Sequence, residues 1–480
     1  MANKENKQNM ALVIVIAAVA STGGLLFGFD TGVISGALPF LRESWGLSTG
    51  QEEWVTTAAL IGAVIGALSS GRIADNFGRK KVILATSIIF AAGSILTGAA
   101  TSPTFLALSR IVIGIAIGIS SFTVPLYISE ISPTKIRGAL VSSFQLMITI
   151  GILVSYFSDH AFADEANPFS WRWMFYVGVF PALILFIGMI FLPETPRFLI
   201  GKGKDKKGRK ILARLEEPAL VEEAIQKIKE DIRRDELAET NWTEIFKPWL
   251  RNALFIAIGI MFVQQFVGIN TIIYYAPTVF IIAGFSGAKA AIAATIIVGV
   301  VNVLATVLSM FLIDKLGRRK LYFIGLSGMA VSLAALGTFF LFKDSLGPSL
   351  KYITVGSILV YILFFAISLG PLGWLIISEI FPLKVRGLGM SIGSLSNWLF
   401  NAIVTFTFLK LAWLFTAPGM EITNHGAATP DPNPAGAFYV YAVIAIIGII
   451  WGIKYIPETK GITLEEIEQH WRDGKAPNEL

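Results

Sequence analysis

The sequence predicts an all-α membrane protein: twelve transmembrane helices in two pseudo-symmetric six-helix bundles, with a small cytoplasmic helical domain between them. Hydrophobic residues make up 54% of the 480 residues and charged residues only 15%, whereas a soluble protein carries about 25% charged residues. Twelve apolar runs are long enough to cross about 30 Å of hydrocarbon, which takes about 20 helical residues. One long charged stretch divides these runs into six and six.

The first six runs are centred near residues 24, 64, 91, 115, 149 and 182, and the other six near residues 266, 300, 331, 364, 401 and 446. The first run is too long for the apolar part of a signal peptide, so we expect it to be retained. Between the halves, Val221, Ile225, Ile228 and Ile232 recur at helical spacing among charged residues, which predicts amphipathic helices. We expect an N-terminal bundle over 1–195, a linker domain over 196–250, a C-terminal bundle over 251–458 and a tail over 459–480.

Basic residues indicate the orientation in the membrane. Arg72, Lys80 and Lys81 follow the second run, and Lys315 and Lys320 follow the eighth. The alternate loops, such as 159–170 and 418–434, have few or no basic residues and several acidic ones. Because basic loops stay on the cytoplasmic side, we expect a multi-pass protein of the cell membrane with both termini in the cytoplasm.

Composition and missing motifs exclude several function classes. The net charge of +6 arises from loop residues that set topology, so nucleic-acid binding is not supported. The chain has no cysteine, and therefore no disulfide or thiolate nucleophile. No phosphate-binding GxxxxGK[ST] motif occurs, and His160, His425 and His470 lie at unrelated positions. We expect no cofactor, no metal site and no enzymatic activity.

The two halves repeat three loop motifs in the same order. GRIADNFGRK at 71–80 is echoed by DKLGRR at 314–319, SEISPTKIRG at 129–138 by SEIFPLKVRG at 378–387, and PETPR from Pro193 by PETKG from Pro457. This pattern predicts a parallel duplication of a six-span unit. In such carriers the substrate sits near the membrane midplane, between two halves that rock against each other.

These loop motifs bring together charged residues that we expect to form a cytoplasmic salt-bridge network. The predicted pairs are Asp75–Arg79, Glu130–Arg137, Glu194–Arg197, Asp314–Arg318 and Glu379–Arg386. One exposed pair contributes about 0 to 1 kcal/mol, but pairs that join the halves only when the cytoplasmic side is closed would bias the conformational equilibrium. The alternative is that these charges serve topology and solubility alone.

The stretch from Phe262 to Pro277 carries Gln264, Gln265 and Asn270 inside an apolar run. An unsatisfied polar group in hydrocarbon costs several kcal/mol, so these amides should face the bundle interior or a wet cavity. Gly268 and Pro277 weaken the helix at two points, and broken helices are common at transport sites. The segment is therefore a candidate binding site; the alternative is amides that join two helices.

Further polar or aromatic residues fall within other spans: Gln145, Asn302, Trp374, Asn397, Trp398 and Asn401. Amides donate to and accept from hydroxyls, and flat rings cover the apolar face of a sugar. The pattern favours a neutral polyhydroxylated ligand. A large cationic drug fits less well, because the lining has no cluster of acidic residues.

Asp30 lies deep in the first span, where a carboxylate is costly unless it is paired or protonated. Arg110, near the start of the fourth span, is the available cation within the membrane. A pair that forms in one conformation and loosens in another would take up and release a proton as a carrier cycles. The alternative is a permanent bridge between two helices.

These motifs together resemble the sugar porter family of the major facilitator superfamily, over nearly the whole chain. PETPRFL, QQFVGIN with its following tyrosines, and PETKG are the most specific. The resemblance implies alternating access by two six-helix bundles. It implies sugar contacts at Gln145, Gln264, Gln265, Asn270, Asn302, Trp374 and Asn397, with Phe27, Gly370 and Trp398 at the pocket. It also implies a gate at Tyr274 and Tyr275, and proton coupling by Asp30 with Arg110.

Facilitators of this family carry a neutral amide where Asp30 stands, so the resemblance favours a proton-coupled symporter over a uniporter of the same fold. Asn397 and Ile152 replace glutamines of the xylose type, which favours a hexose such as glucose or galactose over xylose. A sugar sensor would need longer cytoplasmic extensions, and a drug/proton antiporter lacks the QQFVGIN pocket. We expect the partners to be a monosaccharide, a proton and the bilayer, with the protein a monomer.

Overall fold

The computed structural model describes residues 2–133, 136–215, 220–237, 242–422 and 430–480. His425 and two residues of the first SEISPTKIRG motif lie outside the described residues. Among the described residues the regular secondary structure is helical, apart from an isolated bridge between Ile422 and Asp431.

The N-terminal spans are formed by α1 (Ala2–Trp45), α2 (Thr49–Phe77), α3 (Arg79–Gly98), α4 (Pro103–Ile131), α5 (Arg137–Phe162), and the pair α6 (Trp171–Val177) and α7 (Val179–Phe191). The C-terminal spans are formed by α11 (Arg251–Phe266) with α12 (Ile269–Ile282), α13 (Ala288–Leu316), α14 (Arg318–Leu341), α16 (Leu350–Ile367) with α17 (Leu369–Ile380), α18 (Leu383–Leu414) and α19 (Ala435–Tyr455). Twelve helical stretches of the described residues are long and apolar enough to cross a membrane, as predicted.

The shorter helices lie outside these spans. They are α8 (Pro196–Gly201), α9 (Asp205–Leu215), α10 (Val221–Leu237), α15 (Lys343–Leu346) and α20 (Leu464–Arg472), with 3₁₀ turns at Trp242–Phe246, Pro248–Leu250, Gly347–Ser349 and Pro477–Glu479. Ile200, Leu212, Val221 and Ile225 form a small apolar cluster where α8, α9 and α10 meet. The apolar residues that recur at helical spacing in the sequence therefore pack in a small separate core.

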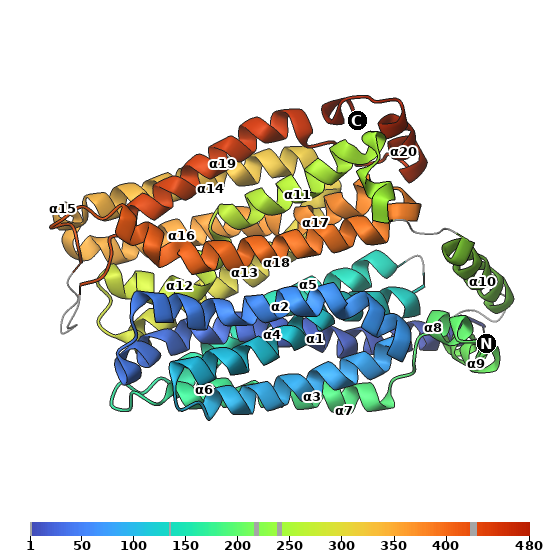
Figure 1. Ribbon diagram of the computed structural model, residues 1–480, viewed down its shortest axis with the longest axis horizontal. Helices are drawn as coiled ribbons and strands as arrows, with labels where there is room; N and C mark the ends of the chain where they lie inside the picture. The colour runs from blue at the N-terminus through green and yellow to red at the C-terminus, as the bar shows by residue number, and fades with distance from the viewer. Residues whose placement is uncertain (1, 134–135, 216–219, 238–241, 423–429) are drawn as a thin grey trace.

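The two bundles lie side by side with their helices along the long axis of the molecule (Figure 1). Both chain ends lie at one end of the bundles, together with α8, α9, α10 and α20; we call this the near end, and the opposite one the far end (Figure 1). Across the boundary between the bundles, α2 packs on α18, α5 on α13, and α1 on α12. These six helices therefore form much of the boundary between the halves.

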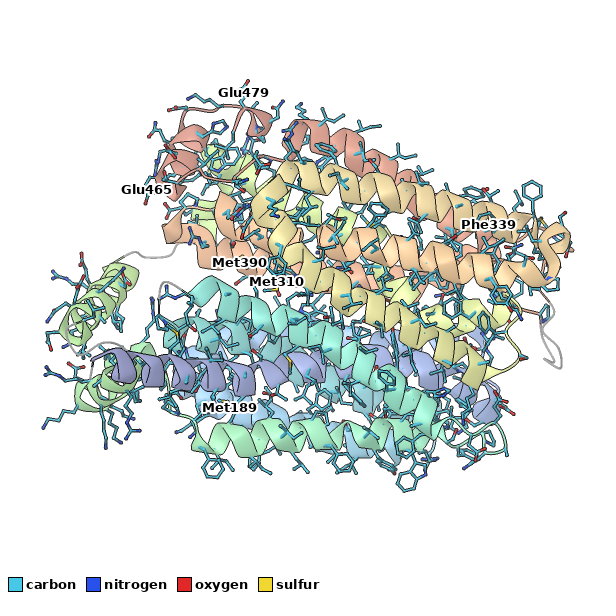
Figure 2. The ribbon with its side chains drawn as sticks, turned by 180° about the vertical axis from the view of Figure 1, so that it is seen from behind. Met189, Met310, Phe339, Met390, Glu465 and Glu479 are labelled. Carbon is cyan, nitrogen blue, oxygen red and sulfur yellow. The ribbon has the colours of Figure 1, made fainter. Side chains whose placement is uncertain are left out.

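The outer surface of the bundles is apolar. Phe191, Val331 and Leu414 are 80%, 71% and 76% exposed, and side chains project outward along the length of both bundles (Figure 2). Apolar surface of this extent on a twelve-span chain is solvated by lipid. The protein is a multi-pass membrane protein.

Close helix contacts hold the N-terminal bundle together. Gly24, Gly28, Gly32 and Gly36 recur every four residues on the side of α1 that packs on α5. A Cβ at Gly28 would lie 1.9 Å from the carbonyl oxygen of Ile148. Small residues at this spacing let two helix backbones approach directly, which is how helices pack in lipid.

The seventh span breaks at Gly268, as the sequence predicts. Gly268 has φ +87°, a left-handed conformation that favours glycine, and a Cβ there would lie 2.5 Å from the ring of Tyr441. The Tyr361 hydroxyl donates to the Val267 carbonyl at 2.9 Å and so satisfies a backbone group at the break. At Pro277, the second predicted weak point, the span does not break, since α12 continues to Ile282.

The tenth span has a break that the sequence analysis did not predict. Helix α16 ends at Ile367 and α17 begins at Leu369, with Ser368 between them at φ −126° and ψ −97°. Gly370 and Pro371 follow at once and could have indicated it, because both residues weaken helices. This break lies beside the break in the seventh span, since the Gln264 side chain donates to the carbonyl of Leu369.

Candidate functional site

The amides of the broken seventh span form one chain of hydrogen bonds. Asn270 donates to Gln265 Oε1 at 2.5 Å, Gln265 donates to Gln264 Oε1 at 3.0 Å, and Asn397 of α18 donates to the same Gln264 oxygen at 2.8 Å. Gln264 Nε2 donates to the Leu369 carbonyl at 2.7 Å. The structure therefore brings four predicted residues from α11, α12 and α18 together beside the break in the tenth span.

Two side-chain oxygens of these hydrogen-bonded amides remain available as acceptors. Both lone pairs of Gln264 Oε1 are taken, but the side-chain oxygens of Asn270 and Asn397 accept no hydrogen bond from another described residue. All four side chains are less than 10% exposed, so water is a poor substitute partner. A hydroxyl that donates to these oxygens would complete the set.

The remaining predicted pocket residues lie on neighbouring helices without joining the amide chain. Gly370 follows Leu369, and Trp374 lies one turn later on α17, hence on the same helix face as Gly370. Gln145 on α5 and Asn302 on α13 come from helices that pack across the two halves. Neither side chain makes a hydrogen bond to another described residue, which leaves both amides free for a ligand.

An aromatic pair joins the halves next to this region. The rings of Phe27 on α1 and Trp398 on α18 have their centroids 5.0 Å apart. Both line a cavity together with Asp30 and Arg110 of the N-terminal half and Tyr274 of the C-terminal half. Two of the predicted pocket residues, Phe27 and Trp398, therefore share a cavity with the predicted proton pair, whereas the amide chain does not line it.

Asp30 and Arg110 meet as a buried, two-pronged ion pair. Arg110 Nη1 donates to Asp30 Oδ1 at 3.4 Å, and Nη2 donates to Oδ2 at 3.3 Å. The two residues are 4% and 1% exposed. The guanidinium also lies 5.7 Å from the ring centre of Phe175. Both hydrogen bonds are longer than the 2.7–2.9 Å typical of charged pairs. The Asp30 carboxylate therefore makes weaker hydrogen bonds to Arg110 than a tight ion pair would.

The two predicted gate tyrosines are buried, at 3% and 0% exposure. The Tyr274 hydroxyl lies within reach of Thr31 and of Asn401, so Asn401 lies beside one of the predicted gate residues. Tyr275 donates to the Thr405 carbonyl at 3.4 Å and packs its ring on Phe408 at 5.1 Å. Both side chains lie where α12 meets α1 and α18.

The near-end charges pair differently from the sequence-based prediction. Asp75 does contact Arg79, at 3.1 Å, but Glu130 also pairs with Arg79, at 3.0 Å, and not with Arg137. Arg137 donates weakly to the Ser132 carbonyl at 3.5 Å. The prediction paired neighbours in sequence, whereas the fold brings α2 and α4 together.

The C-terminal half repeats this arrangement. Arg318 pairs with Glu379 at 2.7 Å, and Asp314 is exposed without an ion pair to any described residue. Thr459 donates to Glu379 at 2.5 Å. The predicted Asp314–Arg318 and Glu379–Arg386 pairs are therefore wrong, and Arg386 donates to the Phe381 carbonyl at 3.4 Å.

Glu194 has a role that charge pairing did not suggest. Its carboxylate accepts the backbone N–H groups of Arg79 and Lys80, both at 3.1 Å, at the start of α3. In the other half Glu458 accepts those of Arg318 and Arg319, at 2.9 and 3.1 Å, at the start of α14. Each carboxylate satisfies unpaired N–H groups and complements the helix dipole. The repeated PET motif was the signal that could have revealed Glu458.

One acidic residue was placed in a loop by the sequence analysis and lies elsewhere. Asp159 belongs to α5 and is fully buried, with its side chain packed on Gly36 of α1. The loop prediction failed because the apolar run ends near this residue in sequence, although the helix continues to Phe162.

Comparison with known proteins identifies the family. A family model described as "Sugar (and other) transporter" matches residues 16–471. The chain belongs to this sugar transporter family. It is 37% identical over 482 residues to the galactose-proton symporter of Escherichia coli strain K12, covering 100% of this chain and 98% of the relative.

Two further relatives of the family differ in the sugar they are named for. The D-xylose transporter of Levilactobacillus brevis is 38% identical over 449 residues, covering 93% of each protein. The inward-open structure of the xylose transporter XylE from E. coli matches with a TM-score of 0.78 and 30% identity, covering 96% of this chain and 100% of that one. The fold class predicted from sequence is thereby confirmed.

Proposed function

We propose that this sugar transporter is a proton-coupled symporter that imports a monosaccharide by alternating access. One observation carries the coupling: the Asp30–Arg110 pair borders the same cavity as Trp398 and Tyr274 of the opposite half. A sugar that contacts Phe27 and Trp398 changes the surroundings of the Asp30 carboxylate, because all three side chains line one cavity. Protonation of Asp30 weakens its pair with Arg110 and so links the proton to movement of the halves.

Within this proposal each group of side chains has a role. The amides Gln264, Gln265, Asn270 and Asn397 hold sugar hydroxyls, and Gln145 and Asn302 add donors from the facing helices. Phe27, Trp374 and Trp398 cover the apolar face of the sugar, beside the backbone of Gly370. Tyr274 and Tyr275 close the far side of the site as α12 moves.

The proposed sugar is a hexose such as glucose or galactose. Asn397 is shorter than the glutamine of the xylose type, and Ile152 is apolar, so the pocket has more room and fewer amides on these sides. A panel of unlabelled sugars competing for binding to the purified protein tests this. Displacement by glucose or galactose at lower concentration than xylose supports the assignment, and the reverse order contradicts it.

The proposed orientation places the near end in the cytoplasm, with the four segments 1–195, 196–250, 251–458 and 459–480 as bundle, linker domain, bundle and tail. It rests on the basic residues of the near-end loops, including the exposed Arg72, Lys81 and Lys315. We propose that the protein works as a monomer, because each chain holds a complete pair of halves.

Uptake into proteoliposomes separates symport from the alternative, a uniporter of the same fold. Sugar uptake is measured with and without an imposed pH gradient, acid outside. Accumulation above the external concentration that appears only with the gradient supports symport. Equilibration to the same level under both conditions would refute it.

A further inference from the structure

The ion pairs that join the two halves lie at the far end, whereas the sequence predicted such a network at the near end. Arg42 at the end of α1 pairs with Asp431, in the segment before α19, at 2.7 Å. Glu53 in the first turns of α2 pairs with Lys410 near the end of α18 at 3.1 Å. By contrast, the near-end ion pairs Arg79–Glu130 and Arg318–Glu379 each stay within one half.

The carboxylates of these far-end pairs are deeply buried. Glu53 is 0% exposed, and it also accepts the backbone N–H of Lys410 at 2.9 Å. Asp431 is 5% exposed. Arg42 bridges the boundary, because its other side donates to Glu52 of α2 at 2.9 Å. The cations are more open: the side chains of Arg42 and Lys410 are 37% and 51% exposed.

Other hydrogen bonds between the halves lie on the same side of the molecule. The Tyr156 hydroxyl donates to the Ile273 carbonyl at 3.2 Å, and the Lys289 backbone N–H donates to Glu165 at 3.1 Å. The polar contacts between described residues of the two halves are thus gathered toward the far end. They exist only while the far end is closed.

We propose that Arg42–Asp431 and Glu53–Lys410 form a far-end latch, which sets how often the carrier opens to the outside. The inference rests on the proposed alternating access. When the halves separate at the far end, both pairs break and the carboxylates regain water. The latch therefore stabilises the far-end-closed state relative to the far-end-open state, and its strength sets their ratio.

The burial of Glu53 determines which conformation the loss of the ion pair favours. Removing the Lys410 charge leaves a buried carboxylate without its cation in the closed state, whereas in the open state the same carboxylate is hydrated. Loss of either partner therefore favours opening. We expect Lys410→Gln to raise the open-to-closed ratio about tenfold, which corresponds to about 1.4 kcal/mol.

The absence of cysteine in the native chain makes the test direct. Spin labels at Thr104→Cys and Ser345→Cys, both exposed at the far end in opposite halves, report its opening by pulsed electron–electron distance measurement. Labels at Asn76→Cys and Lys315→Cys report the near end. In lipid nanodiscs, Lys410→Gln should increase the long-distance population of the far-end pair and shorten the near-end distances.

Two further variants distinguish a latch from general damage. Glu53→Gln should shift the distances in the same direction as Lys410→Gln but less, because it removes the ion pair without leaving a buried charge unpaired. The double variant should match Glu53→Gln and not the sum of the two single shifts. Glu43→Gln, a neutralised and exposed carboxylate one residue from Arg42, should leave the distances unchanged. Additive shifts, or an equal shift in Glu43→Gln, would contradict the latch.

Distance distributions that stay the same in Lys410→Gln and Glu53→Gln would overturn the proposal. The readout needs neither sugar nor a proton gradient, so it is separate from the test of function. A chain that fails to accumulate sugar but opens in the latch variants would refute symport and keep the latch. If the unmodified chain accumulates sugar but the latch variants do not open, symport is supported and the latch is refuted.

Discussion

Replacing Asp30 by asparagine should uncouple sugar movement from protons without abolishing sugar movement. The amide keeps the shape of the side chain, and its oxygen can still accept from Arg110 Nη2, now 3.3 Å from Asp30 Oδ2. It cannot take up or release a proton between pH 5 and 8. Exchange of labelled for unlabelled sugar needs only binding and rocking, so it should persist.

The size of the effect follows from one titratable carboxyl in the cavity. If one proton accompanies each neutral sugar, a gradient of one pH unit supports about tenfold accumulation, or about 1.4 kcal/mol. With the membrane potential held at zero, the unmodified chain should approach this ratio. Asp30→Asn should level off at a ratio of about one.

Arg110 is 1% exposed and would lose its counter-charge, so lower stability accompanies the substitution. The exchange assay on the same vesicles shows whether the variant is folded. Glu43→Gln, which neutralises an exposed carboxylate outside the cavity, is the matched control and should accumulate sugar as the unmodified chain does. Undiminished accumulation by Asp30→Asn would refute the role of this residue.

Three other outcomes are expected. Asn397→Ala removes a donor to Gln264 and should weaken sugar binding roughly tenfold by competition assay, since a hydrogen bond contributes about 0.5–1.5 kcal/mol; unchanged affinity would remove Asn397 from the site. Gly268→Ala forces a Cβ against the Tyr441 ring at a positive φ and should lower the melting temperature. Gly356→Ala, on a helix with open space around it, should not, because alanine is the better helix former. Glu458→Ala leaves N–H groups at the start of α14 unpaired and should cost about 0.5–2 kcal/mol, seen as earlier melting; equal melting would show that water replaces the carboxylate.

The spans could be predicted because hydrocarbon imposes a simple rule: about 20 apolar residues, with every backbone group satisfied inside the helix. The weak point at Gly268 could also be predicted, because glycine weakens a helix. The structure adds that only glycine fits the positive φ there against the Tyr441 ring. Whether Pro277 would break the span could not be predicted from sequence. A proline in a helix removes one hydrogen bond, and the packing around the largely buried α12 keeps the helix continuous.

The partners of charged groups could not be predicted from spacing. Glu130 lies seven residues from Arg137 but pairs with Arg79, because α2 packs on α4. The contact of Asn397 with Gln264 joins residues 133 positions apart. Sequence indicates that an intramembrane amide needs a partner, but only the fold determines which partner it meets. The far-end latch was missed for the same reason, since neither Glu53 nor Lys410 belongs to a repeated motif.

The most direct measurement of the central claim is the number of protons that enter with each sugar. Proteoliposomes containing a pH-sensitive dye receive labelled sugar without an imposed gradient, and proton and sugar entry are followed together. The account predicts one proton per sugar in the unmodified chain and none in Asp30→Asn, with sugar entry in both. Sugar entry without proton entry in the unmodified chain would contradict it.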